Sequence, residues 1–459
     1  DTDIKRSEKK YEEDIIKNLK WLGLNWDEGP YIQSERQEIY QKYIKKLLDS
    51  GQAFWCSHTK EELEMEKNEK MSRGEAPKHK CHSNNVILSE TKNPVVNSKS
   101  TGSFADAHDD KLQKGIIRFR CPSKKLTFTD LIRGKLEFDT GLLGDISIAR
   151  DEKTPLYNLS VVVDDYEMKI THVIRGEDHI SNTQKQILLQ KALGFSSPKY
   201  GHLPLLLGPD RAKLSKRHGA VSLKQYRKQG YLPEAIINFL ALLGWNPGTK
   251  KEIFSLEELI KEFSLERVQK GGAVFNLSRL DWLNGYYIRN MDLDELTKKC
   301  IPHLEKVSGG LYFANLAEAR PPLTFEWLKK VVALEQERLK KLSEIGEMTE
   351  FFFKDKLDYE PELLIWKKIT LEEVKKNLNL IEEKLSRLDE KEFEKEKIKS
   401  ALESLAKEEG SGEIFWPLRA ALTGRKASPG PFEVAEVLGK EKTLKRIREA
   451  KMLLDSSQK

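Results

Sequence analysis

The chain has 459 residues, a formal net charge of +6 and a charged fraction of 33%. This length is too great for one ordinary hydrophobic core, so we expect two to four domains. No apolar run is long enough for a membrane span and no signal peptide is recognisable, so we expect neither a membrane helix nor a secreted protein. Four cysteines at unpaired spacings argue against a disulfide framework and favour a cytoplasmic location.

The first 56 residues predict two helices and a short strand. Residues 7–26 carry apolar side chains on one helical face, and residues 34–50 form a second helix that Ser34 and Gln37 would cap. "AFWC" at 53–56 predicts a strand. Residues 71–115 are polar and without periodicity, so we expect a disordered insertion there.

From residue 116 the chain alternates like a β-rich unit, in "IIRFRC", "LTFTDL", "KLEFD" and "ISIAR". Two apolar runs follow, "PLYNLSVVVDD" and "KITHVIRGEDH", which suit strands of a sheet covered on both faces. A helix at 181–194, capped by Ser181 and Gln184, separates them from the run "HLPLLLG". The order strand, helix, strand predicts an α/β sheet, in which ligands bind at the carboxyl ends of the strands.

The remainder of the chain is predicted to be helical. Helices are expected at 233–243, with Pro233 in the first turn, and at 256–263 behind Ser255. From about residue 322 onward the pattern is helical throughout, with dense Glu and Lys surfaces. The second half should therefore form an all-α region.

The stretch "GPDRAKLSKRHGA" at 208–220 places a cluster of basic side chains on a loop after an apolar strand. Lysine is a flexible point charge, and positive charge placed on a phosphate chain is the main catalytic device of phosphoryl chemistry. Lys213 and Lys216 could therefore stabilise a leaving pyrophosphate. The alternative is an ordinary solvated loop.

Cys56, His58, Cys81 and His82 are the residues that could form a metal site. Their spacing matches no usual zinc pattern, and they flank or lie in the segment expected to be disordered. We therefore predict no metal ligands in this chain.

The loop "KLSKR" resembles the second signature of class I aminoacyl-tRNA synthetases, and "GPDRAKLSKRHGA" is similar to its form in the glutamyl-tRNA synthetase family. The stretches "PLYNLSVVVDDYEMKITHVIRGEDHISNTQKQILL", "YLPEAIINFLALLGWNP", "VFNLSRLDWLNGYYI" and "PLRAALTG" also look like landmarks of this family, in the right order. The likeness covers nearly the whole chain except 71–115 and a patch near 306–322.

The resemblance implies an α/β fold with a Rossmann-type catalytic domain at 1–56 and 155–245, whose first strands would be missing. A β-rich insertion at 57–154 would bind the tRNA acceptor end, with 71–115 disordered. Residues 246–321 would contact the tRNA stem, and the all-α region 322–459 would bind the anticodon.

It also implies a two-step reaction, in which glutamate and ATP form glutamyl-adenylate and the terminal ribose of tRNA(Glu) then takes the glutamyl group. ATP and Mg²⁺ are the expected cofactors, and a monomer is expected. Arg175 and Tyr157 would bind glutamate, Arg175 as a fork for its carboxylate. The expected catalytic residues are Lys213 and Lys216, and the expected ATP-binding set is Lys213, Leu214, Ser215, Lys216, Arg217 and Asp178.

The resemblance assigns tRNA binding to Arg419, Arg425 and Lys426. The alternative for Arg175 is an internal ion pair with Asp164 or Asp178, and each arginine of the helical half could be a solvated charge. The stretch "EDH" at 177–179 could meet adenosine or the substrate ammonium.

The chain departs from the family in one respect. The His-rich first signature is absent, and we therefore expect this chain as written to activate glutamate poorly, as an incomplete form of an ordinary enzyme. Competing hypotheses are a tRNA-binding module without adenylation and an enzyme that glutamylates a modified tRNA base. Glutaminyl specificity is disfavoured by "KLSKR" and by the helical second half.

Overall fold

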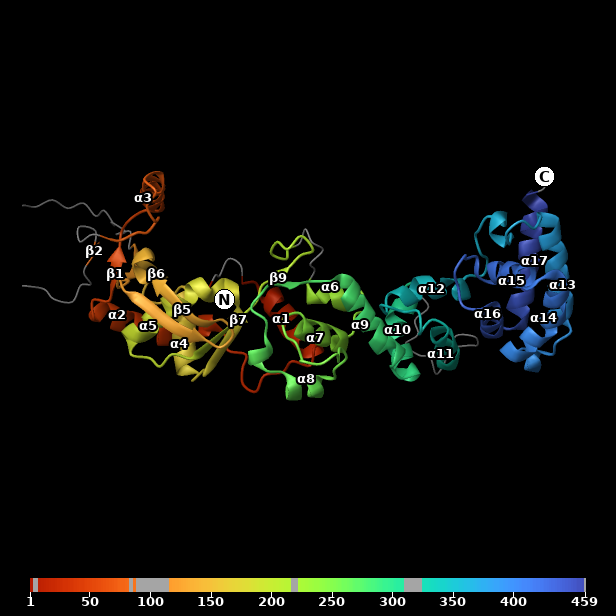
Figure 1. Ribbon diagram of the computed structural model, residues 1–459, viewed down its shortest axis with the longest axis horizontal. Helices are drawn as coiled ribbons and strands as arrows, with labels where there is room; N and C mark the ends of the chain where they lie inside the picture. The colour runs from red at the N-terminus through yellow and green to blue at the C-terminus, as the bar shows by residue number, and fades with distance from the viewer. Residues whose placement is uncertain (3–6, 82–85, 88–114, 216–221, 309–323, 458–459) are drawn as a thin grey trace, which may run out of the picture. The chain divides into compact units, whose positions relative to one another are not determined.

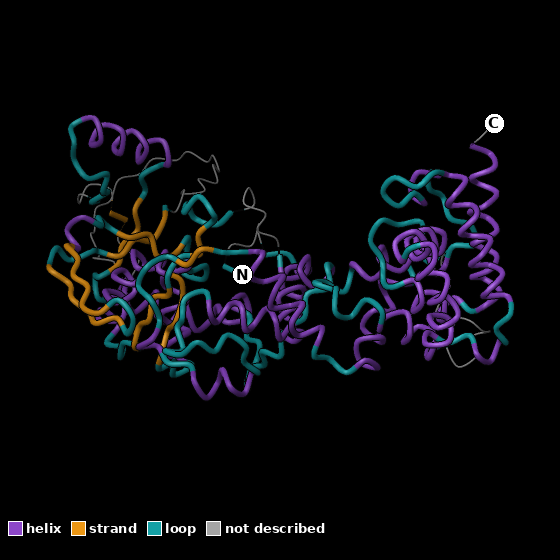
Figure 2. The backbone as a smooth tube through the Cα atoms, turned by 45° about the vertical axis from the view of Figure 1, so that its right-hand side comes forward, coloured by secondary structure: helices purple, strands orange, loops and turns teal. Residues whose placement is uncertain are grey.

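The computed structural model describes residues 1–2, 7–81, 86–87, 115–215, 222–308 and 324–457 (Figure 1). They fall into two compact units. The first comprises residues 1–220 and 240–275, and the second residues 221–239 and 276–459. Strands gather in the first unit and helices make up most of the second (Figure 2).

The first unit contains a mixed four-stranded sheet in the order β5-β4-β8-β7. β7 (His172–Gly176) and β8 (Lys199–Leu203) run parallel, and β8 meets β4 (Lys125–Asp130) in parallel where Asp130 lies opposite Tyr200. β4 pairs antiparallel with β5 (Gly134–Asp139). Two strands expected in the β-rich insertion thus extend the sheet that carries the predicted site.

A second, antiparallel sheet has the order β2-β1-β3-β6. Its strands are β1 (Ala53–Cys56), β2 (Val86–Ile87), β3 (Ile116–Phe119) and β6 (Ile146–Ala149). Apolar residues of β1, β3 and β6 pack in one core with those of α2 (Gln37–Asp49), α4 (Tyr157–Glu167) and α5 (Ile180–Leu193). A short parallel pair, β9 (Leu206–Leu207) with β10 (Ala273–Val274), completes the strands of this unit.

Among the first unit's helices, one overturns a sequence prediction. The run "YNLSVVVDDYE" is not a strand but helix α4 (Tyr157–Glu167). Leu159, Val162 and Val163 are buried at helical spacing, so the apolar run is one packed face of a helix. The other helices of this unit are α1 (Lys9–Trp21), α2 (Gln37–Asp49), α3 (Lys60–Ser72), α5 (Ile180–Leu193) and α8 (Leu256–Glu262).

The predicted helix caps at Ser34 and Ser181 are wrong, and the helix start predicted behind Ser255 is confirmed. α2 is preceded by a 3₁₀ turn, and the Ser34 hydroxyl donates to the Asp1 carboxylate instead of capping. α5 begins at Ile180, so Ser181 lies inside the helix. Ser255 does cap α8, in a capping box with Glu258.

The second unit is helical, which confirms the predicted all-α second half. Its helices are α6 (Leu223–Lys228), most of α7 (Pro233–Leu242), α9 (Leu277–Arg289), α10 (Leu293–Leu304), α11 (Phe325–Ala333), α12 (Glu344–Phe353), α13 (Leu371–Ser386), α14 (Lys395–Glu409), α15 (Ser411–Thr423), α16 (Pro431–Leu438) and α17 (Lys440–Ser457). Within the described residues, no helix is long and apolar enough to cross a membrane.

Among the described residues of the second unit, the carboxylate of Glu335 is almost completely buried. The side chain is 1% exposed and pairs with Arg338 at 2.8 Å, while its Oε1 has no hydrogen-bond partner among the described residues. Burial raises the pKa of Glu335 to about 7 despite the nearby charges of Arg338 and Arg425. A charged carboxylate at this position therefore opposes folding.

Replacing Glu335 by glutamine should flatten the pH dependence of stability. Between the ordinary pKa of 4.5 and the folded value of about 7, the folded chain holds a proton that the unfolded chain has released. The free energy of unfolding of the wild type should therefore fall as pH rises through this window. We expect Glu335→Gln to gain about 1–3 kcal/mol on the wild type across it, measured by urea unfolding. The exposed neighbour Glu337→Gln is the control, and parallel pH profiles for Glu335→Gln and wild type would contradict the expectation.

Candidate functional site

The candidate site lies in the first unit, at the carboxyl ends of β7 and β8. β7 ends at Gly176 and leads through the 3₁₀ turn Glu177–His179 into α5. β8 leads through β9 into the loop that begins at Gly208. This is the edge at which ligands of parallel sheets bind.

Arg175 on β7 is half-buried and hydrogen-bonded only to neutral groups. Its Nη2 donates to Thr183 Oγ1 and to Gln186 Oε1, each at 2.7 Å, and its Nε lies 3.5 Å from Nε2 of His202. No carboxylate of the described residues lies within ion-pair distance of its guanidinium. A half-buried guanidinium without an anionic partner is suited to bind one.

The internal ion pairs considered for Arg175 do not form. Asp164 accepts hydrogen bonds from Gln33, Arg36 and Tyr40, each at 2.9 Å. Asp178 pairs with Lys213 instead. Both carboxylates are thus engaged elsewhere.

Lys213 and Asp178 meet at the exposed side of the site. Lys213 Nζ lies 3.2 Å from Asp178 Oδ2, with 64% and 47% of the two side chains exposed. The hydrogen bond from Lys213 holds the pKa of Asp178 below its ordinary value. An exposed ion pair of this kind is weak, so the lysine can exchange its partner for a phosphate.

The adjacent carboxylate has a structural role. Glu177 forms an ion pair with Arg133, and its Oε1 accepts a hydrogen bond of 3.0 Å from the backbone nitrogen of Leu205. These contacts tie the turn after β7 to the segment after β8. Glu177 is therefore engaged by Arg133 and Leu205, and its contact with adenosine or the substrate ammonium stays a prediction.

Tyr157 opens α4 and is 40% exposed. Its hydroxyl lies 3.2 Å from Nδ1 of His179. The next residue, Asn158, accepts a 3.1 Å hydrogen bond from Gln186, which in turn accepts one from Arg175. The structure thus links the start of α4 to Arg175 through one amide.

The sequence and structure have close relatives across nearly their whole length. Residues 1–282 match the family described as "tRNA synthetases class I (E and Q), catalytic domain", and residues 295–451 match an "Anticodon binding domain". The glutamate–tRNA ligase of Carboxydothermus hydrogenoformans is 40% identical over 97% of this chain and 90% of its own length.

The chain belongs to the class I glutamate–tRNA ligase family. The glutamate–tRNA ligase of Sulfurihydrogenibium sp. is 42% identical, again over 97% of this chain and 90% of its own length. A solved glutamate tRNA ligase from Elizabethkingia meningosepticum, in complex with its amino acid, superposes with a TM-score of 0.78 at 31% identity. It covers 98% of this chain and 91% of its own.

The structure brings together several of the site residues that the resemblance to this family implies. Arg175, Tyr157, Asp178 and Lys213 lie at the carboxyl ends of the strands or on the elements joined to them. Leu214 and Ser215 follow Lys213 on the loop, whereas Lys216 and Arg217 lie outside the described residues.

The three predicted tRNA contacts lie in and just after α15. Arg419 is half-buried, with its guanidinium 6.0 Å from the Trp416 ring. Arg425 pairs with Glu350 at 3.1 Å, and Lys426 is exposed. Their contact with RNA stays a prediction.

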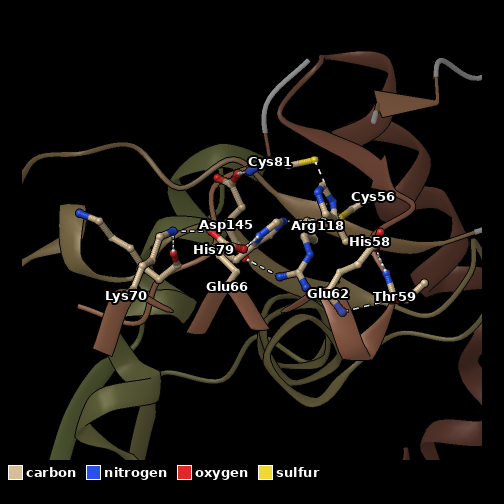
Figure 3. A network of polar contacts seen from close by, with 11 residues as sticks. Cys56, His58, Thr59, Glu62, Glu66, Lys70, His79, Cys81, Arg118 and Asp145 are labelled. Carbon is tan, nitrogen blue, oxygen red and sulfur yellow. Dashed lines mark hydrogen bonds and ion pairs between the residues drawn. The ribbon is translucent and has the colours of Figure 1, made fainter. Parts of the chain in front are cut away.

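Away from this site, four potential metal ligands converge in the β-rich part of the first unit (Figure 3). The ligand atoms of Cys56, His58, His79 and Cys81 all lie within 4.8 Å of one another. Cys56 Sγ is 3.3 Å from His58 Nδ1 and 3.6 Å from His79 Nε2, and Cys81 Sγ is 3.7 Å from His58 Nδ1. The edges of a zinc tetrahedron with ordinary Zn–S and Zn–N bonds are roughly 3.3–3.8 Å long.

The neighbours of this metal-ligand cluster fix its geometry. Glu66 on α3 lies 2.5 Å from His79 Nδ1, which leaves Nε2 for a metal. Asp145 accepts a 2.9 Å hydrogen bond from the Cys81 backbone nitrogen. Burial raises the pKa of Cys81 to about 11, with the Cys56 sulfur contributing.

The cluster corrects one expectation and gives a reason to test another. Residues 75–81 were assigned to a disordered segment, yet they make ordered contacts, including a 2.8 Å hydrogen bond from Lys78 to the Gly141 carbonyl. The prediction of no metal ligands rests on spacing and on the disorder expected of this stretch, and His82 lies outside the described residues. His79 takes the place that had been considered for His82.

A zinc assay tests the cluster directly. The purified protein should contain about one zinc per chain, measured by inductively coupled plasma mass spectrometry, because two thiolates and two imidazoles form a usual zinc site. Cys56→Ser and Cys81→Ser should lose most of it. The buried cysteine Cys300→Ala is the control and should retain it. Zinc absent from the wild type after reconstitution would contradict metal binding.

Proposed function

We propose that this protein attaches L-glutamate to tRNA(Glu) in an ATP-dependent, two-step reaction. One observation carries the proposal for this chain's own site: the half-buried guanidinium of Arg175 has neutral hydrogen-bond partners, and no carboxylate of the described residues lies within ion-pair distance of it. The relationship to glutamate–tRNA ligases over 97% of the chain supports it.

Arg175 would bind the side-chain carboxylate of glutamate. Thr183 and Gln186 occupy Nη2, so Nη1, which has no hydrogen bond to another described residue, is available to the substrate. A charge-assisted bond between guanidinium and carboxylate favours glutamate over neutral amino acids. Tyr157, whose hydroxyl is already directed by His179, would wall the same pocket.

Lys213 would serve the phosphates of ATP. In the first step an oxygen of the substrate's α-carboxylate attacks the α-phosphorus, the bond to the β-phosphate oxygen breaks, and pyrophosphate leaves with the added negative charge. Lys213 can swing from Asp178 toward that charge, and we propose the same role for Lys216. Leu214, Ser215 and Arg217 would line the nucleotide from the same loop.

Mg²⁺ would enter with the ATP phosphates and neutralise part of their charge. At this edge Glu177 is held by Arg133, whereas Asp178 would be released when Lys213 turns to the phosphates. In the second step a hydroxyl of the terminal ribose of tRNA attacks the glutamyl carbonyl, and AMP leaves. We further propose that the protein acts as a monomer in the cytoplasm, where its free cysteines would stay reduced.

A tRNA-binding module without adenylation is not favoured. Such a module would not need an Arg175 guanidinium that, among the described residues, has only neutral hydrogen-bond partners, nor an exposed lysine beside Asp178. ATP–pyrophosphate exchange of the wild type also tests the expectation that this chain activates glutamate weakly.

Lys213→Ala should slow ATP–pyrophosphate exchange on the order of 100-fold, because charge developing on the phosphates loses a cation. Binding of tRNA should be unchanged. Lys135→Ala is a matched control, since Lys135 is also an exposed lysine paired with a carboxylate. An exchange rate of Lys213→Ala equal to that of the wild type would exclude a role of Lys213 in adenylate formation. Tight tRNA binding with no wild-type exchange would favour the module.

Lys426→Ala and Arg419→Ala should weaken the binding of tRNA without affecting ATP–pyrophosphate exchange. If each cation meets a phosphate, the KM for tRNA should rise several-fold and the dependence of log K on log salt should fall by about one. Charging assays at several salt concentrations measure both. Lys407→Ala, an exposed lysine of α14, provides the control. An unchanged KM and salt slope in both variants would exclude these contacts.

A further inference from the structure

A buried chain of polar side chains lies behind Arg175. It runs from Asp130 at the end of β4 to His202 on β8, and from there to Thr183 on α5 and to Arg175. The side chains of Asp130 and His202 are 0% exposed. Sequence reasoning gave neither residue a role.

Asp130 is a charged anchor. It accepts hydrogen bonds from the backbone nitrogens of Ile132, Arg133 and His202, and its Oδ2 lies 2.6 Å from His202 Nδ1. Burial alone would raise its pKa, but these hydrogen bonds hold the pKa of Asp130 below its ordinary value. A buried carboxylate is tolerated only when it is satisfied in this way.

The charge of Asp130 determines the tautomer of His202. A carboxylate can only accept, so the imidazole must carry its proton on Nδ1. Burial lowers the pKa of His202, although Asp130 acts in the opposite sense, and the ring is therefore neutral. Its Nε2 is then an acceptor, 3.5 Å from Arg175 Nε and 2.9 Å from Thr183 Oγ1, whose one proton also has the His179 carbonyl within 3.0 Å.

We propose that His202, fixed by Asp130, is a positioning residue that orients the Arg175 guanidinium for the side-chain carboxylate of the substrate. This inference rests on the proposed function. His202 and Thr183 occupy the Nε and Nη2 side of the guanidinium, and Gln186 takes the second Nη2 proton. The Nη1 end is left for the ligand.

The neutrality of the ring is essential to this role. A carboxylate in direct contact with Arg175 would orient the guanidinium equally well, but it would also neutralise it and compete with the substrate. Because the neutral imidazole lies between them, the negative charge of Asp130 does not contact Arg175. Arg175 thus keeps its charge while its direction is fixed, which is the usual purpose of supporting hydrogen bonds behind a binding group.

The test is glutamate-dependent ATP–pyrophosphate exchange of His202→Asn. An asparagine amide can still donate to Asp130 but has no atom in place of Nε2. We expect the KM for glutamate to rise about 10- to 100-fold. The KM for ATP should stay within about twofold, and the preference for glutamate over glutamine in kcat/KM should fall.

Two further variants keep the test decisive. Thr183→Val removes the hydroxyl that bridges His202 and Arg175, while it leaves the direct contact between them and the pair with Asp130 in place. It should shift the same two quantities even if His202→Asn does not fold. Tyr40→Phe is the control, because it removes a buried hydrogen bond to Asp164 in the same unit without touching Arg175.

The outcomes are distinct. If His202→Asn and Thr183→Val lower the melting temperature like Tyr40→Phe and leave both the KM for glutamate and the glutamate preference unchanged, the network is only structural and the inference is overturned. Absence of exchange in the wild type would instead refute the proposed function.

Discussion

The candidate site depends on the parallel register of β7 with β8. Arg175 lies opposite His202 in this pairing, and Gly176 lies opposite Leu203. Paired residues of neighbouring strands point to the same face, so the register brings guanidinium and imidazole together. A slip by one residue would place Gly201 or Leu203 opposite Arg175 and would turn its side chain to the other face. The Asp130–Tyr200 contact of β4 fixes the same strand from its other side.

Local patterns in the sequence predicted much of the fold. The helices of the second half follow from periodicity, and the strands from 116 to 149 follow from alternation. The helix at Tyr157–Glu167 was missed because three consecutive valines favour a strand locally. Packing against α2 and α5 decided otherwise, since Leu159, Val162 and Val163 share one core with them. The caps at Ser34 and Ser181 failed because a capping pattern does not fix which turn is the first.

The sequence predicted only those parts of the candidate site that lie within short, recognisable stretches of the chain. Arg175, Asp178 and Lys213 stand next to strand ends in recognisable stretches. Asp130 lies 72 residues before His202, and no local pattern joins them. The metal-ligand cluster is hidden for the same reason, because Cys56 and His79 are 23 residues apart and His79 stands in a polar stretch without periodicity. Distance in the chain, and not unusual chemistry, is what concealed both.

Helix α3 buries none of its residues. It is joined to its surroundings by polar contacts, chiefly Glu66 with His79 and Lys70 with the Lys78 carbonyl, so its outward positions contribute nothing to a hydrophobic core. Met65 and Met71 are 66% and 58% exposed there. A fluorescent label attached at such a position would report on the cluster beside it without altering a residue of the candidate site, which makes this helix a convenient handle for spectroscopy.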